Sequence, residues 1–142
     1  MIEPIPAADR PAWRFVAGGV LAAALAVAGN LSWRAAFPSI TGYVVPDVIG
    51  TIPVILSSVL SVLLAAGIYL LLARGLTIAT PLYVVGCLAV AAASCVVAFM
   101  PAMPDGTAPP AGFPLLTIPM HLLAGLMAAA VVPLVVVTGR RR

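Results

Sequence analysis

The chain has 142 residues, of which 63% are hydrophobic and only 8% are charged, and its mean hydropathy is +1.21. A soluble domain has about 25% charged residues, so this chain has too little charge to cover a surface that faces water. Its net charge of +3 comes from arginines that lie at the ends of apolar segments, with no lysine, which excludes a nucleic-acid partner. The composition predicts an integral membrane protein.

Residues 1–12 are polar and contain three prolines, and we expect them to form a cytoplasmic tail before a transmembrane domain over residues 13–138. The first apolar span covers about residues 15–33. A signal peptide is the alternative interpretation, because Arg10 and Arg14 precede the apolar run and residues 26–28, Ala-Val-Ala, resemble a cleavage site. The run continues to Trp33, which favours a retained helix.

Three further apolar spans follow, at about residues 48–73, 81–100 and 113–137, and basic residues 139–142 close the chain. Residues 34–47 form the first outer connection, and the proline-rich and glycine-rich residues 101–112 form the second. The link between the second and third spans is so short that these two helices must be an antiparallel hairpin. The predicted fold is an all-α, antiparallel four-helix transmembrane bundle.

The distribution of charge predicts the orientation of this bundle. If the N-terminus is cytoplasmic, every arginine except Arg34 lies on the inner side, as the positive-inside rule requires. Aromatic residues gather near the same boundaries and predict belts at both membrane interfaces: Trp13, Phe15, Tyr69 and Tyr83 at the inner ends, and Trp33, Phe37, Tyr43, Phe99 and Phe113 at the outer ends. The absence of lysine, with abundant alanine, valine, glycine and proline, is typical of GC-rich bacterial genomes. We therefore expect a multi-pass protein of a bacterial inner membrane with both termini in the cytoplasm.

Small residues predict where helices approach closely. Gly18, Ala22 and Ala26 recur every four residues along the first span, and Gly125 lies on the fourth span. Such small residues let neighbouring backbones pack together inside a membrane.

Weakly polar residues predict a layer in the outer half of the bundle, formed by Asn30, Ser57, Ser58, Ser94, Thr117 and His121. One interpretation is hydrogen bonding between helices that fixes their register. The other is a site for a small molecule, a lipid headgroup or a proton. His121 is the only histidine, and we expect it to bond to Asn30, Ser57, Ser94 or an ordered water.

No pattern of catalytic residues accompanies this layer. The sequence has no HExxH, no glycine-rich phosphate loop and no GxSxG, and a single histidine cannot build a multi-histidine metal site. No acidic residue lies within a predicted span. We expect no enzymatic activity, no cofactor and no metal.

The last span carries Met-His-Leu-Leu-Ala-Gly at residues 120–125, then Val-Pro-Leu at residues 132–134 and Arg140. With Asn30 and Arg74, these residues resemble a family of small bacterial four-helix membrane proteins known only as a domain of unknown function. The resemblance covers about residues 13–140. It implies the fold and implies no activity, cofactor or catalytic residue.

Two functions remain open from the sequence. The first is a structural or accessory membrane protein that associates with itself or with a larger membrane complex in the lipid bilayer. The alternative is a small transporter or a protein that binds a lipid or small molecule through the polar layer around His121. A cavity that reaches His121 favours the alternative, whereas a dry core with an apolar partner face favours the first.

Overall fold

The computed structural model describes residues 7–99, 102–103 and 106–138, and these residues form helices and no strands. The long helices are α1 (Ala12–Thr41), α2 (Thr51–Gly75), α3 (Ala79–Ser94) and α4 (Phe113–Thr138). Short 3-10 helices are η1 (Ala7–Asp9), η2 (Asp47–Ile49) and η3 (Cys95–Phe99), the last of which continues α3. Four helices, with η3 counted as part of α3, are long and apolar enough to cross a membrane. The predicted all-α four-helix bundle is confirmed.

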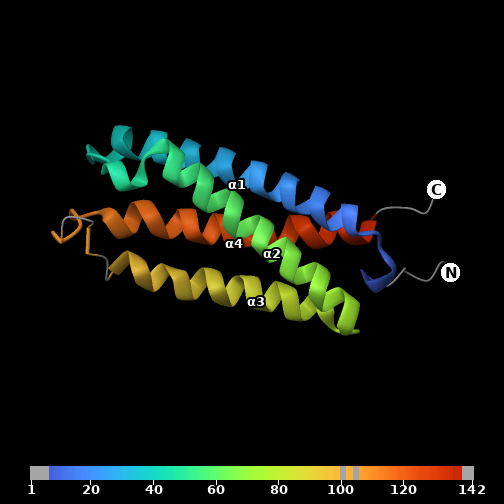
Figure 1. Cartoon of the computed structure of the whole chain (residues 1–142). Coiled ribbons are helices and arrows are strands. Elements are labelled where there is room, and N and C mark those ends of the chain that lie inside the picture. Colours follow the sequence, from blue (N-terminus) through green and yellow to red (C-terminus); the bar gives the residue numbers. More distant parts are fainter. Residues whose placement is uncertain (1–6, 100–101, 104–105, 139–142) are drawn as a thin grey trace.

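The helices are arranged with α4 between α1 and α3, while α2 crosses the bundle obliquely (Figure 1). At one end, here called the terminal end, α1 begins, α4 ends and the short α2–α3 turn lies between them. The opposite end, here called the long-loop end, carries the α1–α2 and α3–α4 connections. At the long-loop end α2 lies beside α1, and it reaches α3 at the terminal end. Because α2 crosses in this way, α2 and α3 diverge towards the long-loop end.

The helix boundaries differ from the predicted spans mainly in α1. The predicted first span ends near residue 33, but α1 continues through Pro38 to Thr41, so most of the predicted outer connection is helical. The extra turns persist because Phe37 is buried against residues of η2 and α4 and because Pro38 lies in the last turn, where it removes only one backbone hydrogen bond. Gly42 caps the end of the helix: it has a left-handed backbone conformation (φ 71°), and its backbone N–H donates to the Pro38 carbonyl oxygen.

The other spans shift by a few residues. Helix α2 begins at Thr51 rather than near residue 48, because Gly50 has an extended backbone. Regular α-helix in the third span stops at Ser94 and continues as 3-10 helix to Phe99. The predicted tail before residue 7 and the basic residues 139–142 lie outside the described residues.

Aromatic side chains form the core of the terminal end. Phe15 and Tyr69 have ring centroids 5.2 Å apart, and Tyr69 and Tyr83 stack with centroids 4.5 Å apart. All three are buried, so the predicted aromatic belt is wrong for these residues, although Trp13 at the same end is exposed. The tyrosines are stable inside the bundle because their hydroxyls have partners: Tyr69 bonds to Thr80 at 2.7 Å, and Tyr83 donates to the Ala128 carbonyl at 3.1 Å.

Arginine side chains also join the helices at this end. The buried Arg10 donates to the Val137 carbonyl at 2.7 Å, and Arg14 donates to the Val135 carbonyl at 3.4 Å. Both acceptors lie in the last turn of α4, where carbonyl groups lack helical partners and a positive charge is favourable. Arg74 at the end of α2 donates to the Arg10 carbonyl at 3.5 Å. The start of the chain is thereby attached to α2 and α4.

The small residues singled out in the sequence lie at helix contacts. Ala22 and Ala26 are fully buried. A Cβ atom added to Gly18 would lie 3.1 Å from the Val132 carbonyl oxygen of α4. One added to Gly125 would overlap the Cβ of Ala91 on α3. Helix α1 therefore uses its small-residue stripe within the chain, and α3 meets α4 at Gly125.

Candidate functional site

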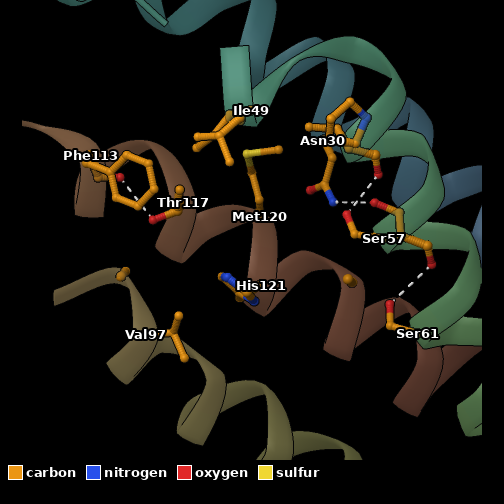
Figure 2. A pocket seen from close by; sticks show the side chains of 15 residues that line it. Asn30, Ile49, Ser57, Ser61, Val97, Phe113, Thr117, Met120 and His121 are labelled. Atoms are coloured by element: carbon orange, nitrogen blue, oxygen red, sulfur yellow. Dashed lines mark hydrogen bonds between the residues drawn. The ribbon is translucent and has the colours of Figure 1, made fainter. Parts of the chain in front are cut away.

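A groove of about 440 Å³ opens beside α4 where α2 and α3 diverge. Its walls come from α1, η2, α2, η3 and α4 (Figure 2). Its polar lining residues are Asn30, Ser57, Ser58, Ser61, Thr117 and His121. Because Ser57, Ser61 and His121 are exposed, the groove opens at the surface of the bundle and is not enclosed. All residues of the predicted polar layer except Ser94 line it.

Asn30 reaches the groove from the middle of α1. Its side chain is only 3% exposed, and its Nδ2 donates to the Ser58 hydroxyl on α2 at 3.0 Å. This bond joins α1 to α2 inside the bundle. The second polar atom of the amide, Oδ1, is buried and has no hydrogen-bond partner among the described residues. An unpaired buried polar atom costs about 1–3 kcal/mol, so Asn30 is only half satisfied by the chain itself.

His121 lies on α4, between Met120 and Val97 in the close view (Figure 2). The imidazole is exposed to the groove and forms no hydrogen bond within the described part of the chain. None of the three expected side-chain partners, Asn30, Ser57 and Ser94, bonds to His121, and the alternative bond to an ordered water stays a prediction. Asn30 bonds to Ser58 instead, and the hydroxyls of Ser57 and Ser94 donate to backbone carbonyls of their own helices, as helical serines often do. Both ring nitrogens of His121 remain available to a molecule in the groove.

The hydroxyls of the groove are weakly polar because each donates to a carbonyl of its own helix. Ser57 donates to Val54, Ser61 to Ser58 and Thr117 to Phe113, at 3.2, 3.2 and 2.9 Å. Their oxygens still have lone pairs that accept hydrogen bonds. Ser94 donates to Ala91 at 2.8 Å and does not line the groove. The serines and Thr117 therefore offer acceptors rather than charges.

The apolar lining of the groove was not predicted from the sequence. It includes Ile49 of η2, Val97 of η3, and Phe113 and Met120 of α4. These residues come from three elements that are separate in the sequence, and hydropathy does not encode how helices cross. A comparison of depths along the spans could have found Met120, which lies one residue before His121.

Charged residues do not line the groove. None of the described lining residues is Asp, Glu, Lys or Arg. Arg34 is half-buried near its outer edge, where its Nε donates to the Ile49 carbonyl. In the part of the chain that the structure describes, no three His, Cys, Asp or Glu side chains gather as a metal site would require. The groove thus combines neutral hydrogen-bonding groups with an apolar wall, as small-molecule pockets do.

Comparisons with protein-family models, curated proteins and solved structures gave no match. The resemblance to the bacterial four-helix family consequently stays a prediction. The groove is therefore the feature of the molecule that bears on its function.

Proposed function

We propose that this chain is a non-enzymatic membrane protein that binds a small amphiphilic molecule in the groove beside α4, between α2 and η3. The observation that carries the proposal is the pair of unsatisfied groups there, the Asn30 Oδ1 atom and the His121 imidazole. Polar groups at membrane depth are costly and are commonly functional. A bound molecule that hydrogen-bonds to both groups would remove that cost.

The shape of the groove supports entry from the bilayer. Its opening lies along the side of the bundle, between helices whose outer faces are apolar, such as Leu56 and Leu60 on α2 and Val96 on η3. Those faces suit contact with lipid tails. An amphiphile could therefore place its polar head in the groove while its tail stays among the lipids.

The same proposal includes a location and an orientation. Arg10, Arg14 and Arg74 all lie at the terminal end, and Arg34 lies near the long-loop end. By the positive-inside rule, this distribution supports an orientation with the terminal end in the cytoplasm, and we propose a bacterial inner membrane as the location. The groove faces the outer half of that membrane.

A structural or accessory protein that associates with itself or with a larger complex was the first expectation from the sequence, and it has less support than binding in the groove. It relied on small-residue faces in excess of what one bundle needs. The stripe of Gly18, Ala22 and Ala26 is buried within the chain, and Ser57 and Ser61 line the groove instead of facing a partner. The mass of the purified particle in mild detergent checks this prediction directly.

The proposed binding can be tested on lipids that copurify with the protein. We expect the parent to retain a small molecule that His121→Leu loses by about tenfold, because one hydrogen bond to a membrane-buried group is worth on the order of 1 kcal/mol or more. The measurement is mass spectrometry of extracts from equal amounts of folded protein. Leu122→Ala is the matched control, since Leu122 is exposed on the same turn of α4 and does not line the groove. Identical extracts from the parent and His121→Leu would refute the proposal.

A further inference from the structure

On the basis of the proposed function, we infer that the ligand of the groove is an uncharged amphiphile whose head carries both a hydrogen-bond donor and an acceptor. Lipids with a charged headgroup are excluded. Three features of the groove lead to this class: the charges of its lining, its depth along the helices and the hydrogen-bonding groups it leaves free.

The described side chains that line the groove are polar but uncharged. One amide, one imidazole and several hydroxyls face the groove, and none of the described lining residues carries a carboxylate, an ammonium or a guanidinium group. A charged head would leave water without meeting an opposite charge, which is far more costly than moving a neutral polar head. Arg34 is not among the described lining residues, and its Nε already donates to the carbonyl of Ile49, which does line the groove.

The depth of the polar groups gives a second argument. Helix α4 has 26 residues, about 39 Å at 1.5 Å per residue, against a hydrocarbon core of about 30 Å. If the excess is shared between both ends, the hydrocarbon begins about 4–5 Å below the start of α4. His121 lies eight residues after Phe113, or about 12 Å along the axis, hence roughly 7 Å inside the hydrocarbon. A charged phosphate would have to leave the headgroup layer to reach the depth of His121. A neutral head is not held in the headgroup layer by charge and can reach that depth.

The free hydrogen-bonding groups define the head. A neutral imidazole donates with one nitrogen and accepts with the other. Asn30 adds one unpaired amide atom, and the oxygens of Ser57 and Ser61 accept. A head with a hydroxyl and a second oxygen that accepts satisfies this set. Two kinds of membrane lipid share that chemistry: a quinol, whose two hydroxyls donate and accept, and a diacylglycerol, which has one hydroxyl and two ester carbonyls. A groove of about 440 Å³ lies in the usual size range for ligand sites, and its side opening leaves room for a long tail.

The test uses the purified full chain in mild detergent and three probes with short tails: a decyl-substituted benzoquinol, dioctanoylglycerol and dioctanoyl phosphatidylglycerol. Equilibrium binding is measured for the parent, His121→Leu and the control Leu122→Ala. We expect at least one neutral probe to bind the parent at least tenfold more tightly than phosphatidylglycerol. We expect His121→Leu to weaken that binding about tenfold and Leu122→Ala to leave it unchanged. The better neutral probe identifies the source of the head.

Two other outcomes are distinguishable: one contradicts only the uncharged head, and the other contradicts binding in the groove as well. If phosphatidylglycerol binds as tightly as the neutral probes and depends on His121, the groove binds lipids but the inference about charge is wrong. If no probe binds, or if binding is the same in parent and His121→Leu, the proposed function fails as well. The comparison between neutral and charged probes uses the parent alone, so it holds even if His121→Leu does not fold. Ser57→Val, at an exposed position in the lining, then replaces His121→Leu as the groove variant.

Discussion

The contact between α3 and α4 at Gly125 can be tested by adding a single methyl group. An added Cβ at this position would overlap the Cβ of Ala91 and lie 3.5 Å from the Cys87 carbonyl oxygen. Ala91 is buried, and backbone atoms stand behind it. The change Gly125→Ala therefore requires α3 and α4 to move apart. Gly86→Ala is the matched control, because a Cβ added there meets nothing within 4 Å.

Two opposing effects set the magnitude. Replacing glycine by alanine within a helix stabilises it by about 0.5–1 kcal/mol, and this gain applies at both positions. Overpacking a tight contact costs about 1–3 kcal/mol, and this loss applies only at Gly125. We expect Gly125→Ala to lower the free energy of unfolding by up to about 2.5 kcal/mol, and to be about 1–3 kcal/mol less stable than Gly86→Ala. Gly86→Ala should leave it unchanged or raise it by up to about 1 kcal/mol.

The assay is reversible unfolding in mixed micelles, followed by circular dichroism as the fraction of denaturing detergent rises. Adding Ala91→Gly to Gly125→Ala should restore part of the lost stability, because the double variant exchanges the methyl group between the two helices. A double-mutant cycle isolates this coupling. If Gly125→Ala is as stable as Gly86→Ala, the close approach of α3 and α4 is wrong.

The remaining predictions concern α1, the aromatic core and the orientation. Ala22→Leu should lower the melting temperature in detergent because Ala22 is fully buried. The control Ala24→Leu, at an exposed position on the same helix, should leave the melting temperature unchanged. Equal melting temperatures for the two variants would mean that the stripe of Gly18, Ala22 and Ala26 faces lipid. Tyr83→Phe should cost about 1 kcal/mol in the same unfolding assay, because it removes a buried hydrogen bond to a carbonyl of α4; an unchanged midpoint would contradict that bond. A reporter active only in the periplasm should give no signal when fused after Arg142, and a strong signal would reverse the orientation.

Hydropathy and short links were enough to predict the bundle. Each apolar run is long enough to cross a bilayer, and the short α2–α3 link permits only a hairpin. The extent of α1 was missed because Arg34 and Pro38 look like the end of a span. The helix passes both, since Arg34 donates to the Ile49 carbonyl and Phe37 packs in the core of the long-loop end.

The candidate site was only partly predictable. Depth along the spans brought Asn30, Thr117 and His121 into one layer, and these residues do line one groove. Their bonding could not be predicted, because serine hydroxyls in helices have acceptors on their own backbone. The inward direction of Tyr69 and Tyr83 was missed for a similar reason: an aromatic residue near a helix end suits an interface or a core, and its hydroxyl partner decides between them.

Both halves of this bundle have a packed core, but the unpaired polar groups that line the groove lie in the half towards the long-loop end. The terminal end has stacked rings, buried alanines and arginines that bond to the last turn of α4. The polar side chains that line the groove form few bonds between helices. Within the described residues, the only such bond joins Asn30 to Ser58. His121 and Ser57 are exposed in the groove, whereas Tyr69 is fully buried between the rings of Phe15 and Tyr83. Substitutions at His121 or Ser57 should therefore change binding with little effect on unfolding, whereas substitutions at Tyr69 should do the reverse.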